Sequence, residues 1–144
     1  MESAILGLIL DTSLLIAGER GGRTPENLLE GWAAAFGSTN IALSAITVVE
    51  LTHGVYRAKT PEQLARRLSF MDDMLAGLPI YPLTGEVAKL AGRISGEQVG
   101  RGIQLGLADL LVGATAIFLG YGVATLNRKD FARIPGLSIV DLPA

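Results

Sequence analysis

The chain has 144 residues, the usual size of one domain with a substantial buried core, and 49% of them are hydrophobic. A net charge of −2 excludes the globally basic surface common in nucleic-acid-binding proteins, although bound divalent cations would make the local potential more positive. With no cysteine, disulfide frameworks and thiolate metal sites are excluded. We therefore expect one domain, residues 1–144, in a reducing compartment such as the cytoplasm.

The high mean hydropathy of +0.42 raises the question of a membrane protein. Three windows carry almost no charge: residues 4–18, 31–49 and 102–127. Each is interrupted or ended by a carboxylate, namely Asp11, Glu50 and Asp109. A carboxylate within a bilayer costs several kcal/mol, and a membrane span needs about 20 apolar residues. We expect no membrane segment, and Glu2 and Asp11 also argue against a secretory signal.

The first half of the chain alternates apolar strands with amphipathic helices. A run of branched apolar residues at 5–10 predicts a strand buried on both faces. Pro25 suits the first turn of a helix, and Ser44 is a plausible N-cap for another. In chain order we expect a strand at 5–10, a helix at 14–17, a loop at 18–24, a helix at 25–36, a turn at 37–40, a strand at 41–43 and a helix from 44 to about 58.

The second half continues the alternation. Thr60 and Pro61 open a helix in the usual order of cap and proline, and glycines interrupt the later segments. The expected segments are a helix at 60–76, an extended piece at 79–83, a helix at 84–99, a glycine-rich loop at 100–106, a helix at 108–121, a strand at 123–126, a polar loop at 127–131 and a strand at 137–140. Short apolar strands separated by helices indicate an α/β fold with a mainly parallel central sheet flanked by helices.

Oxygen-bearing side chains follow the expected strands. In α/β sheets, sites form beyond the carboxyl ends of the strands, so these side chains are expected at one edge. They are Asp11 after the first strand, Glu50 in the helix after the second, Asp109 in the first turn of a later helix, and Asn127 and Asp130 after the following strand. Hard oxygen ligands suit Mg²⁺ or Mn²⁺ and suit zinc poorly. Two such ions can promote hydrolysis of a phosphodiester.

Four stretches of the chain resemble the motifs of PIN-domain ribonucleases, in particular the VapC-type toxins of bacterial and archaeal toxin–antitoxin pairs. They are residues 10–13 (LDTS), 44–51 (SAITVVEL), 107–109 with 114–116 (LAD and ATA) and 124–131 (ATLNRKDF). The resemblance runs from residue 5 to residue 142, in the family's order and approximate spacing. It implies a single PIN-like α/β domain.

The resemblance also implies an activity and partners: a Mg²⁺- or Mn²⁺-dependent endoribonuclease, a cytoplasmic homodimer that cleaves RNA and is inhibited by a cognate VapB-type antitoxin. Asp11, Glu50 and Asp109 match three acidic metal ligands. Asn127 occupies a position where the family often has Asp, which puts occupancy of a second metal in question, and Asp130 is the alternative ligand there.

The same resemblance assigns supporting roles. Ser13 and Thr125 match small hydroxyl residues that position ligands, water or the scissile phosphate. Arg128 and Lys129 are expected beside the site, where they would contact phosphates or form an ordinary solvated charged run.

Other interpretations of these residues stay open from the sequence. Asp11 is also a candidate helix N-cap, and Asp109 suits a helix N-terminus. Asn127 and Asp130 are also typical turn residues. His53, the only histidine, is expected to be structural. The alternative function is a catalytically degenerate PIN domain that binds RNA or protein, with Asn127 as its supporting feature.

Overall fold

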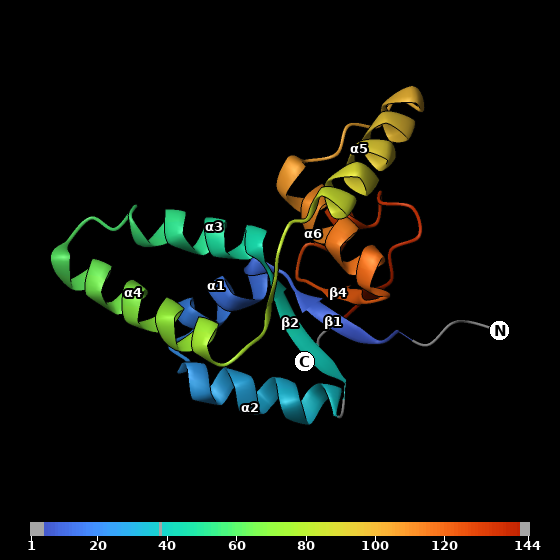
Figure 1. The fold of residues 1–144 in the computed structure, drawn as a ribbon. Helices are drawn as coiled ribbons and strands as arrows, with labels where there is room; N and C mark the ends of the chain where they lie inside the picture. Colours follow the sequence, from blue (N-terminus) through green and yellow to red (C-terminus); the bar gives the residue numbers. More distant parts are fainter. Residues whose placement is uncertain (1–4, 38, 142–144) are drawn as a thin grey trace.

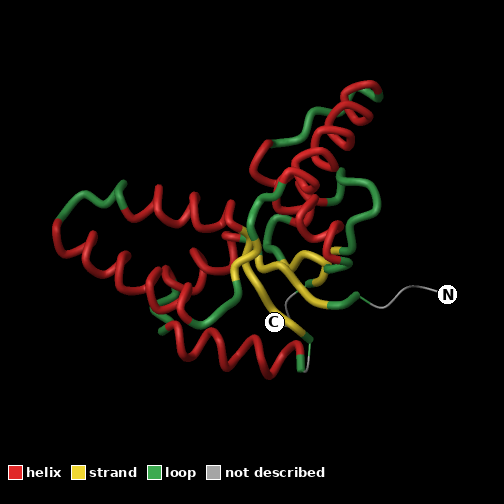
Figure 2. The backbone as a smooth tube through the Cα atoms, viewed as in Figure 1, coloured by secondary structure: helices red, strands yellow, loops and turns green. Residues whose placement is uncertain are grey.

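The branched apolar run near the start of the chain becomes the central strand of a parallel sheet. The computed structural model describes residues 5–37 and 39–141, and in these residues five strands pair in the order β3-β2-β1-β4-β5 (Figures 1 and 2). The strands are β1 (Gly7–Leu10), β2 (Asn40–Ser44), β3 (Ile80–Tyr81), β4 (Gly122–Ala124) and β5 (Ile139–Val140). All four pairings are parallel, which confirms the predicted α/β class.

Successive side chains of the strands enter two separate cores, as the period of two along a strand requires. Leu8 and Leu10 pack in one core, while Ile9 packs in the core on the opposite face. β1 pairs with β2 on one side and β4 on the other, so all four of its residues are buried. This is the arrangement that a continuous apolar run predicts.

Helices cover both faces of the sheet. Side chains of α1 to α4 form the core with Leu8 and Leu10, and those of α5 to α7 form the core with Ile9. Figure 1 shows α3 and α4 projecting side by side, away from α5 and α6. The helices are α1 (Thr12–Arg20), α2 (Pro25–Phe36), α3 (Ala45–Val55), α4 (Pro61–Ala76), α5 (Gly85–Gly100), α6 (Leu107–Leu119) and α7 (Arg128–Phe131).

Two local predictions were wrong. The helix expected at 14–17 is α1, which runs through Gly18 to Arg20 into the expected loop. Packing extends it: a Cβ at Gly18 would lie 2.6 Å from a methyl group of Leu28, so glycine lets α1 and α2 approach closely. The polar loop expected at 127–131 contains α7, because the fully buried Phe131 fixes this turn against the core.

Helix ends follow the expected local signals more closely. The hydroxyl of Ser44 accepts a hydrogen bond from the Ile46 amide at 3.2 Å and so caps α3, although α3 ends at Val55 rather than near residue 58. The helix expected at 108–121 ends at Leu119, because Gly120 adopts φ +73°, a left-handed conformation that glycine adopts without strain. The expected turn at 37–40 includes Ser38, which lies outside the described residues, as do residues 1–4 and 142–144.

Within the described part of the chain, no helix combines the length and the apolarity needed to cross a membrane.

Candidate active site

The predicted site lies at the topological switch point of the sheet, between β1 and β4. Strand order places β1 beside β4, and the connections from these two central strands lead outward to opposite sides. A cleft opens at the carboxyl ends of parallel strands at such a point. Here a cleft of about 720 Å³ is lined by Asp11, Glu50, Asp109 and Asn127, among others. Four of the five residues predicted to be catalytic therefore share one cleft.

Asp11 is the most enclosed of these groups, with 4% of its surface exposed. Its Oδ2 accepts hydrogen bonds from the hydroxyls of Ser13 and Thr125, both at 2.8 Å. Asp11 occupies the N-cap position of α1, but its side chain makes no capping hydrogen bond. The carboxylate is thus held by two hydroxyls from different segments, as a buried charge requires.

The same two hydroxyls attach the segment after β4 to Asp11. Thr125 Oγ1 accepts from the Asn127 amide at 2.8 Å, and Ser13 Oγ accepts from the Leu126 amide at 3.1 Å. Each hydroxyl therefore donates to the carboxylate and accepts from the backbone. Ser13 and Thr125 orient Asp11 and fix the backbone that carries Asn127.

Glu50 has a comparable partner that the sequence did not reveal. The Thr12 hydroxyl, which is 4% exposed as a residue, donates to Glu50 Oε1 at 2.7 Å. The Thr47 hydroxyl lies 3.3 Å from that of Thr12 and is fully buried. A signal existed for Thr47, which precedes Glu50 by three residues and shares its helix face. Nothing in the sequence pairs Thr12 with Glu50, because the contact joins α1 to α3.

Asp109 lies half-buried in the first turn of α6. The pKa of Asp109 is raised to about 6, chiefly by burial and in addition by the negative charges of Asp11, Asp130 and Glu50, while Arg133 opposes the rise. Four carboxylates therefore act on one another at this edge of the sheet. Such like-charge crowding is characteristic of sites that bind a cation or carry out proton chemistry.

The donor set suits a hard divalent cation, because carboxylates surround one cleft and repel one another there. Among the described side chains, however, no three of the His, Asp or Glu groups come close enough together to hold one metal ion. The predicted ligands Asp11, Glu50, Asp109 and Asp130 are therefore neighbours rather than a preformed coordination shell.

The residues after β4 divide between the cleft and the outer surface. Asn127 lines the cleft and is exposed, whereas the exposed Asp130 lies on α7 and acts on Asp109 through its charge. Lys129 is exposed on the same turn. Arg128 forms a bidentate ion pair with Asp141, at 3.0 Å from Nε and 3.1 Å from Nη2. Arg128 would have to leave this pair to contact a phosphate.

Two further residues, His53 and Arg20, line the cleft although neither was predicted to belong to the site. His53 is exposed at the wall of the cleft, one turn after Glu50. Arg20, which the sequence assigned to a loop, reaches the cleft from the last turn of α1. It was missed because the length of α1 depends on its packing against α2.

Comparison with known proteins agrees with this geometry. The PIN domain family matches residues 8–137. Ribonuclease VapC1 of Rickettsia felis is 36% identical over 135 residues, covering 94% of this chain and 96% of the relative. Ribonuclease VapC of Rickettsia bellii is 33% identical over 138 residues, covering 96% and 98%. A chain in the crystal structure of VapBC2 from Rickettsia felis bound to a promoter DNA fragment aligns with a TM-score of 0.80 and 26% identity, covering 94% of this chain and 98% of that one. The chain under study therefore belongs to the PIN domain family.

Proposed function

We propose that this protein is a metal-dependent endoribonuclease and the toxin of a VapBC-type toxin–antitoxin pair. One observation carries the proposal: the buried carboxylate of Asp11, held by two hydroxyls, opens into a cleft that it shares with Glu50 and Asp109. The relatives named ribonuclease VapC match nearly the whole chain, which supports the same activity. Residues 1–144 would then act as one PIN-like domain.

Asp11, Glu50 and Asp109 would hold Mg²⁺ or Mn²⁺, with Asn127 or Asp130 completing a second position. A bound ion of this kind supplies Lewis acidity, which lowers the pKa of water and stabilises negative charge on a departing oxygen. The mutual repulsion that raises the pKa of Asp109 favours cation binding, because a cation relieves it.

The protein's own residues would position the reactants. Ser13 and Thr125 hold Asp11, and Thr12 holds Glu50, so both carboxylates keep fixed orientations. Lys129 and, on leaving Asp141, Arg128 would bind phosphates beside the cleft. The oxygen of a water molecule attacks phosphorus and the bond to the 3′ oxygen breaks. The products are a 5′-phosphate and a 3′-hydroxyl, and the water's protons pass to the leaving oxygen and to solvent.

The partners of the chain follow from its relatives. In the VapBC2 structure from Rickettsia felis the related chain is part of a VapBC assembly, and this chain pairs with a VapB-type antitoxin. A homodimer is supported by large apolar side chains exposed at the cleft, notably Val49 at 64% and Leu126 at 57%. The site of action would be the cytoplasm, where a cellular RNA substrate is available.

The decisive experiment incubates the purified protein with RNA and Mg²⁺ or Mn²⁺ and maps new 5′-phosphate ends. Asp11→Asn keeps the size of the side chain but removes its charge and replaces one acceptor oxygen by an NH2 group, so cleavage should be lost. An exposed carboxylate on α4 provides the matched control, because Asp72→Asn makes the same change at a residue that does not line the cleft. Equal cleavage by the Asp11→Asn protein would show that the assignment is wrong.

The second candidate is a catalytically degenerate PIN domain that binds RNA or protein. It is favoured by one observation: Asn127 lines the cleft at a position where the family often has Asp and sometimes Asn. Crystals soaked in Mn²⁺ separate the two candidates, since anomalous scattering locates the ion directly. Density between Asp11 and Asp109 supports the nuclease, and its absence at high Mn²⁺ supports the binding module.

A further inference from the structure

Two more hollows join the carboxylate cleft along α1. The cleft shares Glu50 and Gly54 with a small cavity of about 150 Å³ between α1, α3 and α4. That cavity shares Arg67 and Phe70 with an open hollow of about 580 Å³ between α4 and the connection from α1 to α2. Arg20 lines all three. The small cavity and the outer hollow adjoin the cleft and are together named the α1–α4 groove.

The α1–α4 groove is rich in arginine. Four arginines line it: Arg20, Arg23, Arg66 and Arg67. Beyond Glu50 the groove contains two carboxylates, Glu19 and Asp73, so it is locally positive in a protein of net charge −2. Across residues 5–37 and 39–141, none of the four guanidinium groups has a carboxylate oxygen within 4.0 Å. Within these residues, intramolecular ion pairs do not neutralise the four arginines, so their positive charge is available to a ligand.

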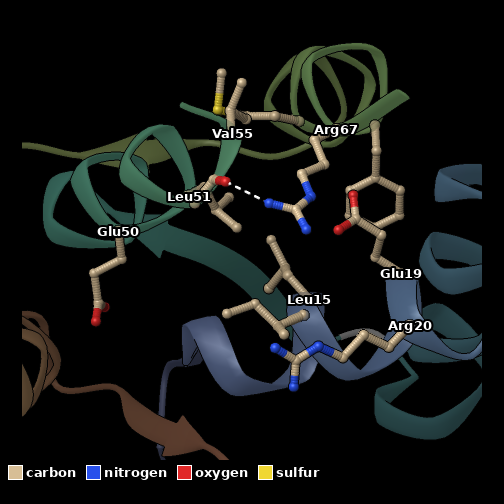
Figure 3. A pocket seen from close by; sticks show the side chains of 11 residues that line it. Leu15, Glu19, Arg20, Glu50, Leu51, Val55 and Arg67 are labelled. Carbon is tan, nitrogen blue, oxygen red and sulfur yellow. Dashed lines mark hydrogen bonds between the residues drawn. The ribbon is translucent and has the colours of Figure 1, made fainter. Parts of the chain in front are cut away.

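The close view in Figure 3 shows how these charges lie relative to Glu50. Glu50 stands at one end of the cavity and points away from it, whereas Arg67 and Glu19 face each other at the opposite end. Arg20 extends from α1 between these ends. Arg67 donates to the Gly54 carbonyl at 2.9 Å, which links α4 to α3. Burial raises the pKa of Glu19, and the nearby charges of Arg67, Arg20 and Arg66 oppose that rise.

An aromatic side chain lines the same hollows as these arginines. Phe70 of α4 is half-buried and lines both the small cavity and the outer hollow. Grooves that combine positive charge with aromatic side chains are typical of single-stranded nucleic-acid binding, because phosphates follow the charges and bases stack on the rings. An apolar peptide would contact the apolar side chains of the small cavity but would leave the four arginines unpaired.

We infer that the α1–α4 groove binds the single-stranded RNA that extends from the cleavage site. Arg20, Arg23 and Arg66 contact successive phosphates, and Phe70 stacks on a base. Arg67 keeps the groove open by holding α3 and α4 together. This inference rests on the proposed ribonuclease function, since it assigns the groove to the substrate of that same cleft. Helix α1, about 13 Å long, would separate the cleft from the outer phosphate sites.

The test measures binding and salt dependence separately from cleavage. A fluorescein-labelled, unstructured RNA of 12 nucleotides is titrated with the full-length Asp11→Asn protein, and anisotropy is followed across several KCl concentrations. Adding Arg23→Gln and Arg66→Gln should reduce the slope of log K against log salt by about 1.4, because each single-strand phosphate contact contributes about 0.7. Phe70→Leu should weaken binding about tenfold with little change in slope.

The matched control makes the same charge change on the opposite face of the sheet. Lys89→Gln with Arg93→Gln alters α5, whose residues line none of the three hollows. This variant should keep the parent salt slope. Circular dichroism and thermal unfolding verify that each variant is folded, and variants of Arg23 and Arg66, which are exposed, are expected to remain so.

The outcomes separate this inference from the proposed function. If the unmodified protein cleaves RNA but the Arg23 and Arg66 substitutions leave both slope and affinity unchanged, the groove inference is overturned and the nuclease stands. If RNA binding depends on these arginines but no divalent cation supports cleavage, the groove stands and the nuclease is wrong. Loss of antitoxin binding without any change in RNA binding assigns the groove to the protein partner and overturns the inference.

Discussion

The hydroxyl of Thr12 donates a 2.7 Å hydrogen bond to Oε1 of Glu50, joining the first residue of α1 to the middle of α3. Ser13, the next residue, supplies one of the two hydroxyls that hold Asp11, so this segment contacts the carboxylates of the first two motifs. Their relative orientation depends on the start of α1. This relationship makes Thr12 a positioning residue.

Replacing Thr12 by Val removes the hydroxyl but keeps the shape of the side chain, so the variant tests the hydroxyl alone. Loss of a hydrogen bond to a metal-ligating side chain typically lowers metal affinity or activity by about 10–100-fold, and we expect a loss in this range. Thr12→Ser retains the hydroxyl and should retain most activity. Mn²⁺ titration by calorimetry and RNA cleavage rates provide the two measurements. Equal Mn²⁺ affinity in the Val and Ser proteins would contradict the role.

The two hydroxyls on Asp11 should behave as one unit. Ser13→Ala or Thr125→Val each removes one donor from a buried carboxylate and should destabilise the protein by about 1–3 kcal/mol. Because both act on Oδ2, the effects of the two substitutions should not add. Urea unfolding of the single and double variants measures the coupling. The same cycle in the Asp11→Ala background, which has no side-chain acceptor, is the control, and an identical coupling there would refute the interpretation.

Asp109→Asn should stabilise the metal-free protein while removing cleavage. The pKa of Asp109 is about 6 in the folded protein against an ordinary value of 3.8, so the folded state holds the proton more tightly. The associated stability is present below about pH 4 and is lost as pH rises through about 6. At neutral pH the Asn protein should gain about 1 kcal/mol, allowing for screening by water at this half-buried position.

Unfolding in urea with EDTA, compared at about pH 4 and pH 7, tests the Asp109 prediction. The stability difference between parent and variant should grow between these two pH values. Excess Mg²⁺ at neutral pH should stabilise the parent more than the variant, since the cation offsets the repulsion among the carboxylates. A variant less stable than its parent at both pH values would contradict the prediction.

The pair between Arg128 and Asp141 sets up a competition with RNA. Both groups are exposed, so breaking the pair should leave the thermal midpoint nearly unchanged. Asp141→Asn frees the guanidinium and should strengthen RNA binding at low salt, whereas Arg128→Gln should weaken it. Lys129→Gln provides a comparison on the same turn. RNA affinity in the inactive Asp11→Asn background is the measurement, and an effect of the same sign in both Asp141 and Arg128 variants would exclude the competition.

Local signals in the sequence were sufficient for most of the fold. The buried strand predicted within residues 5–10 and the Ser44 cap each depend on neighbouring residues, and the structure confirms both. The two errors came from longer-range packing: Gly18 continues α1 because it contacts Leu28, and Phe131 folds a polar turn into α7.

The sequence by itself determined the α/β class and the acidic residue types of the site, because strand periodicity, capping and motif spacing are properties of short segments. Only the tertiary structure decided which side chains meet. Three features join segments far apart in the chain: the pairing of Thr12 with Glu50, the hydroxyl of Thr125 on Asp11, and the arginines of the α1–α4 groove. Their proximity depends on the order of strands and the packing of helices, which no local pattern records.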